Sequence, residues 1–338
     1  MERKYDPSLL AAEYMRKNTP IMRYNDGDNF AKWQSEAREK LYELLGLDMF
    51  VKCESEFEVE YEKEFDEFRE IRFSFQSEEG YYIPCHLLIP NGAKEKTPVF
   101  VCLQGHSSGM HISLGRPKYE GDEKSISGGD RDFAIRAVKE GFCAVTVEQR
   151  YMGERGGNGA ETGCASQGTA LASLLIGRTA IGERVWDTMR AIDVLIEKFP
   201  IIDESNIMCM GNSGGGTTTY YVSCIDERIK LSMPSCSVCT YKDSIAAMHH
   251  CCCNYIPNIA KYFDMGDLGG LLAPRKLIVV AGKEDPIFPI EGVMESYEII
   301  ERMYKAAGAE NNVKLVIGDG GHRFYANKAY AALKGDWE

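Results

Sequence analysis

The stretch Asn206–Gly216, NIMCMGNSGGG, joins a short apolar run to a serine with glycines on both sides. A continuous apolar run of this length is typical of a β-strand that is covered on both faces of its sheet. The residues that follow, GTTTYYVSCID, contain no proline and can begin a helix. A sharp turn between strand and helix lifts a serine hydroxyl clear of the sheet, and the glycines let neighbouring backbone pass close by. The stretch therefore predicts that Ser213 is a nucleophile at the end of a buried strand.

Buried strands and amphipathic helices alternate on both sides of this turn. The further apolar runs expected to form strands are PVFVCL, CAVTV, KLIVV and VKLVI, which begin at Pro98, Cys143, Lys276 and Val313. Apolar residues at helical spacing predict helices from about residue 133 to 140, 183 to 199 and 293 to 304. This alternation predicts an α/β fold with a mostly parallel central sheet and helices on both faces.

The first hundred residues follow different patterns. Apolar residues from Phe30 to Leu44 share one helical face, and Gly46 is placed to end that helix. Two later segments alternate at period two, which predicts antiparallel first strands that are half buried. Their apolar rows are Phe57, Val59 and Tyr61, then Ile71, Phe73 and Phe75. A third short strand, YYIPCHLLIP, is expected next.

A second copy of the Gly-x-Ser-x-Gly pattern occurs at Gly105–Gly109. It also follows a predicted strand, but the residues after it, MHISLGRPKYEGDEK, contain Gly and Pro breaks and no helical period. Because the chemistry needs a strand-to-helix turn and not merely the pentapeptide, the copy at Ser213 is favoured as the nucleophile.

The order of residues along the chain predicts which carboxylate and which histidine act with Ser213. After Ser213, the strand KLIVV leads into Asp285, and the strand VKLVI leads into His322. Carboxyl ends of parallel strands meet at one edge of a sheet, so the three side chains are expected to lie together. His322 would remove the serine proton, and Asp285 would orient the imidazole. Glu284 and Asp319 are rivals for the carboxylate, but Asp319 is very close in sequence to His322.

From Pro98 to Tyr325 the chain resembles the α/β-hydrolase superfamily, and within it the acetyl xylan esterase-like and dienelactone hydrolase-like branch. The matching pieces are LQGH, EQRYMGERG, WDTMRAIDVL, GNSGGG, LLAPRKLIVVAGKEDPIFP and GDGGHRF, together with the helical approach KWQSEAREKLYELLGL. The resemblance implies an α/β-hydrolase fold and ester cleavage. Dienelactone hydrolases carry Cys at the nucleophile position, whereas this chain has Ser213, which favours ordinary ester hydrolysis.

A tetrahedral intermediate needs N–H donors for its oxyanion. One donor should be the backbone N–H of Gly214, which directly follows the nucleophile. The resemblance implies that the second donor is the backbone N–H of His106, with Ser107 as the alternative. Arg150 and Glu154 either form a buried ion pair that braces the site or belong to a solvated run of charge.

Cysteine and histidine gather in two segments, Cys236 with Cys239 and His249–Cys253. These residue types bind zinc and Cys-x-x-Cys is a ligand spacing, but three adjacent residues cannot easily converge on one ion. The interpretation favoured is packing or pocket lining, so neither a metal nor another cofactor is expected. A structural metal and a redox pair remain alternatives.

Composition limits the partners. The 338 residues carry a net charge of -12, which argues against nucleic acid and anionic membrane surfaces as partners. No apolar export segment is apparent and the 12 cysteines predict reduced thiols, so a cytoplasmic location is expected. We expect one domain over residues 1–338, with an N-terminal helical segment to about residue 50 and an insertion near 240–270 over the active site. A homo-oligomer is left open.

These expectations combine into a serine carboxylic-ester hydrolase that acts on a small-molecule ester. The enzyme is expected to remove small acyl groups, above all acetyl groups from sugars or xylo-oligosaccharides. The alternatives are a serine peptidase of the same fold, a non-catalytic ligand receptor on this scaffold, and a Cys/His metal or redox protein.

Overall fold

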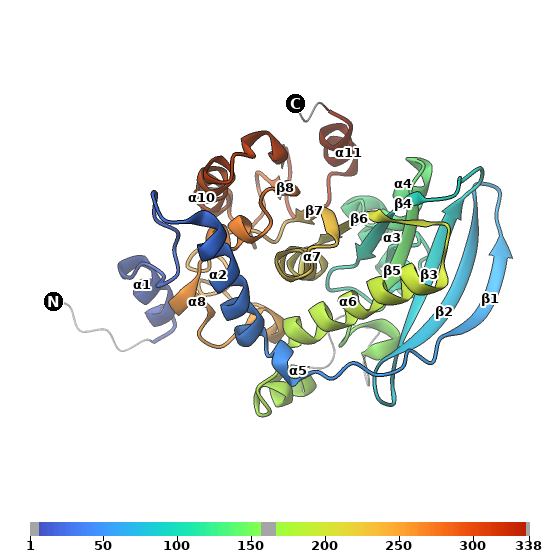
Figure 1. The fold of residues 1–338 in the computed structure, drawn as a ribbon, viewed down its shortest axis with the longest axis horizontal. Coiled ribbons are helices and arrows are strands. Elements are labelled where there is room, and N and C mark those ends of the chain that lie inside the picture. The colour runs from blue at the N-terminus through green and yellow to red at the C-terminus, as the bar shows by residue number, and fades with distance from the viewer. Residues whose placement is uncertain (1–6, 157–166, 336–338) are drawn as a thin grey trace.

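The computed structural model describes residues 7–156 and 167–335 (Figure 1). The strands are β1 Glu58–Glu64, β2 Phe68–Glu78, β3 Tyr81–Pro90, β4 Thr97–Leu103, β5 Cys143–Val147, β6 Ile202–Asn212, β7 Ile229–Ser235, β8 Lys276–Gly282 and β9 Val313–Gly318. The α-helices are α1 Leu10–Lys17, α2 Phe30–Leu45, α3 Asp122–Gly129, α4 Phe133–Lys139, α5 Gln167–Leu174, α6 Ala180–Lys198, α7 Gly214–Ile225, α8 Ile259–Tyr262, α9 Met265–Leu268, α10 Ile290–Ala306 and α11 Ala326–Lys334. Within the described ranges, no helix is both long enough and apolar enough to cross a bilayer.

All nine described strands form one sheet in the order β1-β2-β3-β5-β4-β6-β7-β8-β9. The strands β1, β2, β3 and β5 pair antiparallel in succession, and the pairs from β5–β4 to β8–β9 are all parallel. This is the mostly parallel α/β-hydrolase sheet that the alternation of strands and helices predicts.

Helices cover both faces of the sheet. The larger core packs α2, α6, α7 and α10 against one face, and the smaller core packs α4 and α11 against the other. In Figure 1, α6 and α7 run along the middle of the molecule beside the sheet. Local sequence sets the ends of these helices. In α2, the Asn29 side chain accepts a hydrogen bond from the Lys32 N–H, and Gly46 ends the helix with a left-handed φ of 73°.

Two details differ from the pattern-based expectations. The strand β1 is exposed along its whole length, with Val59 41% and Tyr61 43% exposed, so the expected half-buried row is wrong for this strand. It is an edge strand of the sheet, with a neighbouring strand on one side only among the described residues. The strand β7 was not expected, because its sequence IKLSMPS mixes Ser and Pro with apolar residues. Its position between β6 and β8 buries it, and that position is set by the topology.

The carboxyl ends of the parallel strands meet at one edge of the sheet. There β4 leads into Gly105 and His106, β6 into Ser213, and β7 into Cys236. At the same edge β8 leads to Asp285 and β9 to His322. Loop residues that are more than 200 positions apart in sequence therefore surround one point.

Candidate active site

Ser213 occupies the turn between β6 and α7. Its backbone has φ 57° and ψ −126°, a conformation that L-residues rarely adopt. Backbone strain of this kind costs on the order of 1–3 kcal/mol and persists only where surrounding contacts enforce it. Here the Ser213 N–H donates to the Ser235 carbonyl at 2.8 Å, which ties the turn to β7. The geometry is that of a strained nucleophile turn.

Close backbone packing explains the glycines around this serine. A Cβ on Gly215 would lie 2.0 Å from the Leu103 carbonyl oxygen, a separation that no side chain tolerates. A Cβ on Gly105 would lie 3.0 Å from the Ser213 Cβ. The loop after β4 therefore lies directly against the nucleophile turn, which is where an oxyanion loop must be.

Asp285 and His322 form a hydrogen-bonded pair, with His322 Nδ1 2.8 Å from Asp285 Oδ2. The other carboxylate oxygen of Asp285 accepts the N–H groups of Ile287 at 2.9 Å and Phe288 at 3.2 Å. Burial alone would raise the pKa of Asp285, but these hydrogen bonds and the His322 charge outweigh it and lower the pKa. The carboxylate is thus ionised and fixed in direction, as the partner of a catalytic imidazole must be.

The third contact of a catalytic triad, between the serine hydroxyl and the histidine ring, is not formed as a hydrogen bond among the described residues. No hydrogen bond joins Ser213 Oγ to the His322 ring in the described part of the chain, although both residues follow strands at the same edge. Such contacts are often long in the free enzyme and shorten when substrate binds. The rivals for the carboxylate lie elsewhere: Glu284 is exposed, and Asp319 pairs with Lys328 at 2.8 Å.

Two further side chains, neither of them expected at the Asp285–His322 pair, lie against it. The Phe288 ring stacks nearly parallel on His322, with 6.0 Å between ring centroids. Cys236 places its sulfur within 4.8 Å of ligand atoms of both Asp285 and His322. Burial first, and then the neighbouring Asp285 charge, raise the pKa of Cys236 to about 12, so the thiol stays neutral at pH 7. The sequence pattern singled out Cys236 as one of a Cys-x-x-Cys pair, but its place beside Asp285 and His322 follows from the strand β7, which the pattern did not predict.

Two of the residues expected to supply oxyanion donors, Gly214 and His106, lie close to Ser213. Gly214 is the first residue of α7, and N–H groups in the first turn of a helix have no acceptor within the helix. The His106 ring packs over Gly214, since a Cβ there would lie 2.8 Å from the ring. The 12-residue helix α7 also directs the positive end of its dipole at the nucleophile.

Two further residues missed from the sequence hold the loop after β4. Glu148 Oε1 accepts Gln104 Nε2 at 2.7 Å and the Met110 N–H at 3.0 Å. Gln149 donates to the Gln104 carbonyl and accepts a hydrogen bond from Thr218 in α7 at 2.7 Å. The end of β5 therefore fixes the oxyanion loop relative to the helix that follows the nucleophile.

The second Gly-x-Ser-x-Gly copy lies in this loop, and its Ser108 belongs to a Ser-His-Asp cluster with His111 and Asp122. Ser108 Oγ is 3.0 Å from His111 Nε2, and that same nitrogen is 2.8 Å from Asp122 Oδ2. A proton relay needs the serine and the carboxylate on opposite ring nitrogens, so this cluster cannot act as a triad. Ser107 Oγ reaches only the Gly109 carbonyl, at 3.5 Å. The cluster braces the loop.

Of the two alternatives for Arg150 and Glu154, the ion pair between them is not formed. Arg150 pairs with Asp187 at 2.8 Å and also contacts Glu78, whereas Glu154 pairs with Arg72 at 2.6 Å. The reason is that α6 delivers the buried Asp187 directly to Arg150, a contact over 37 positions that local sequence does not reveal.

The Cys/His segments separate in space. Cys236 lies beside the Asp285–His322 pair, and Cys239 contacts the Pro289 carbonyl. His106, Cys251 and Cys253 meet in a cluster of their own.

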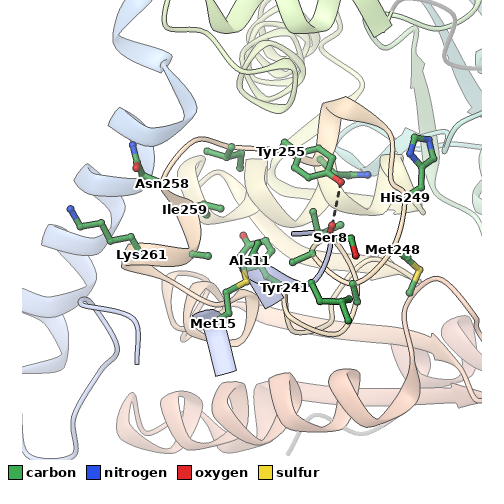
Figure 2. A pocket seen from close by; sticks show the side chains of 17 residues that line it. Ser8, Ala11, Met15, Tyr241, Met248, His249, Tyr255, Asn258, Ile259 and Lys261 are labelled. Atoms are coloured by element: carbon green, nitrogen blue, oxygen red, sulfur yellow. Dashed lines mark hydrogen bonds between the residues drawn. The ribbon is translucent and has the colours of Figure 1, made fainter. Parts of the chain in front are cut away.

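A cavity of about 620 Å³ lies between α1 and the segment from Tyr241 to Lys261 (Figure 2). Its walls are mostly apolar. Figure 2 shows Ala11 and Met15 of α1 facing Ile259 and Tyr241 across it. None of Ser213, Asp285 or His322 lines this cavity, so it is separate from the candidate catalytic residues.

A serine on the turn after β6, with an Asp–His pair after β8 and β9 at the same edge of a mostly parallel sheet, is the arrangement of the α/β-hydrolase class. The chain belongs to the Abhydrolase family, whose model matches residues 11–326.

Similar proteins carry the same fold. A Bacillus subtilis (strain 168) protein provisionally named hydrolase YtaP is 24% identical over 249 aligned residues, and the match covers 70% of this chain and 81% of that protein. A Bacteroides fragilis structure provisionally described as an acetyl xylan esterase matches with a TM-score of 0.77 and 17% identity, covering 93% of this chain and 83% of that one. A glucuronoyl esterase from Solibacter usitatus matches with a TM-score of 0.67 and 16% identity, covering 93% and 97%.

Proposed function

We propose that this hydrolase is a serine carboxylic-ester hydrolase that works through an acyl-serine intermediate. The observation that carries the proposal is the 2.8 Å bond between Asp285 and His322 at the sheet edge where the strained turn presents Ser213. A serine hydroxyl is a weak nucleophile at neutral pH and needs such an oriented base.

In the proposed reaction, His322 Nε2 accepts the Ser213 proton as Oγ attacks the ester carbonyl. Asp285 stabilises the imidazolium, and the N–H groups of Gly214 and of His106 or Ser107 bind the oxyanion. Each such donor contributes roughly 3–4 kcal/mol to the transition state. The protonated His322 then gives its proton to the leaving alcohol, and water repeats the sequence to release the acid.

For the substrate, we propose small acyl groups, above all acetyl groups on sugars or xylo-oligosaccharides. The acetyl xylan esterase-like structure among the neighbours supports this choice. The glucuronoyl esterase structure makes a uronic acid ester the competing substrate within the same reaction class. A cytoplasmic location and a small-molecule partner fit this proposal, and oligomerisation stays an open prediction.

The test is a panel of p-nitrophenyl esters of rising acyl length, acetylated xylo-oligosaccharides and a methyl glucuronate ester, run on the wild type and on Ser213→Ala. We expect acetyl esters to be cleaved fastest and kcat to fall at least about a thousandfold in Ser213→Ala. Ser107→Ala is the matched control and should lose far less, since its backbone N–H remains.

Other outcomes would identify the alternatives. Faster cleavage of aminoacyl p-nitroanilides would indicate a peptidase. Failure of a fluorophosphonate probe to label Ser213 would indicate a non-catalytic receptor.

A further inference from the structure

His106, Cys251 and Cys253 form a cluster outside the proposed proton relay. One ligand atom from each lies within 4.8 Å of the other two. His106 Nε2 is 3.0 Å from Cys253 Sγ, and Cys253 Sγ is 3.3 Å from Cys251 Sγ. We propose that this cluster is a binding site for one thiophilic divalent cation, with Zn²⁺ as the expected occupant.

The distances suit tetrahedral zinc. Bonds of about 2.3 Å to sulfur and about 2.0 Å to nitrogen place two sulfurs roughly 3.8 Å apart and a nitrogen roughly 3.5 Å from a sulfur. The observed separations of 3.3 Å and 3.0 Å are shorter by about 0.5 Å, so small rotamer changes admit the ion. Two thiolates and one imidazole leave a fourth position for water, as in open zinc sites.

The sequence argument against convergence overlooked two facts. Cys251 directly precedes the 3₁₀ turn Cys252–Asn254, and this turn brings the Cys251 and Cys253 sulfurs to 3.3 Å, whereas Cys252 is not part of the group of ligand atoms. The third ligand comes from a loop more than 140 positions away, since His106 follows β4.

Access also favours a cation. Arg184 Nη1 lies 3.4 Å from Cys253 Sγ, and the two thiolates that form when the ion binds together carry more charge than this one guanidinium. Cys253 is buried, whereas His106 and Cys251 are partly exposed and offer a route of entry. As each sulfur–metal bond forms, the thiol proton passes to solvent, so binding weakens as the pH falls.

The proposed metal site lies next to the nucleophile turn. His106 packs over Gly214 and its backbone belongs to the oxyanion loop, so a bound ion would tie that loop to the 251–253 segment. The ion thereby acts as a positioning element beside the nucleophile, and the site exists whether or not the proposed esterase activity is correct.

The experiment is a titration of the full-length, reduced and chelator-treated protein with Co²⁺ and then Zn²⁺ under anaerobic conditions. Thiolate-to-cobalt charge-transfer absorption, metal content per chain and the Zn²⁺-dependent rise in Tm are measured. Carrying it out in the Ser213→Ala background separates metal binding from catalysis.

We expect one equivalent of metal in the parent protein and in Cys252→Ser, the matched control. The double variant Cys251→Ser/Cys253→Ser should show neither the charge-transfer band nor the rise in Tm. Its affinity for the metal should fall by more than about 100-fold, the upper end of the loss that changes to residues outside the ligand set cause. If the double variant fails to fold, the partly exposed Cys251→Ala provides the same comparison.

Three outcomes would overturn the proposal. They are the absence of a charge-transfer band in the parent protein, unchanged binding in the double variant, and loss of binding in Cys236→Ser alone. The last result would place the ion at Cys236, Asp285 and His322, the other described group of ligand atoms within 4.8 Å of one another.

Discussion

Asp285 is the residue whose chemistry can be separated most cleanly from its structural role. Its carboxylate receives His322 Nδ1 on one oxygen and backbone N–H groups on the other. In Asp285→Asn the shape is kept, but the amide can present an N–H to His322 and favour the wrong tautomer. We expect kcat to fall by about 10⁴-fold, the loss known for this change in trypsin-like enzymes, with little change in Tm.

Asp319→Asn is the matched control for this prediction. Asp319 is an exposed carboxylate close to the same histidine in sequence, and it pairs with Lys328. Steady-state kinetics on both variants check the prediction. Equal losses, or a loss in Asp319→Asn alone, would mean that the carboxylate has been assigned to the wrong residue.

At the scale of elements, contact between β4 and the start of α7 shapes the nucleophile turn. Gly215→Ala would push a Cβ against the Leu103 carbonyl, so we expect a loss of about 1–3 kcal/mol or more in the free energy of unfolding. In Gly128→Ala the new Cβ meets only Lys124 Cγ at 3.9 Å, and stability should not fall. Urea denaturation of both variants provides the comparison, and equal stability in the two would refute the packing argument.

The loop that β5 braces depends on a buried carboxyl group. Burial raises the pKa of Glu148 from 4.5 to about 8, against the opposing effect of the N–H groups that it accepts. Between those pH values the folded state holds a proton that the unfolded state releases. The free energy of unfolding therefore contains a component that decreases as the pH rises from about 4.5 to 8.

Glu148→Gln cannot titrate, so we expect Tm to depend less steeply on pH over this interval than in the wild type. The control is Glu284→Gln, an exposed glutamate at the same sheet edge, which should keep the wild-type slope. Thermal unfolding from pH 5 to 9 measures both. An unchanged slope in Glu148→Gln would show that the carboxyl is ionised in the folded protein at neutral pH.

At the scale of the whole molecule, α1 stands apart from the catalytic residues. Among its described residues only Ala12 is buried, while four residues from Ser8 to Met15 form one wall of the apolar cavity. Removing residues 1–17 should therefore open that cavity but leave cooperative unfolding, kcat and KM for a small ester close to wild type. Calorimetry and kinetics on the truncated chain test this, and a large rise in KM would place substrate in the cavity.

Local pattern predicted much of the fold. Period-two and period-3.6 spacing located α2, α6, α10 and most of the parallel strands, because burial on one face dictates the spacing of apolar residues. The same reasoning failed for β7 and for the burial of β1. Whether a segment forms a strand and how far it is buried depend on the strands and helices that pack beside it. The local sequence of the segment does not contain that information.

The sequence by itself determined the order and type of the elements and the positions of Ser213, Asp285 and His322 at strand ends. This is possible because all parallel strands joined by helices end at the same edge of the sheet. Residues that directly follow such strands therefore lie near one another in space. Only the tertiary structure decided which side chains meet there from distant loops: Cys236 beside Asp285, Asp187 against Arg150, and His106 with Cys251 and Cys253. These contacts join segments that local sequence does not connect, since packing of the whole chain sets their distance and direction.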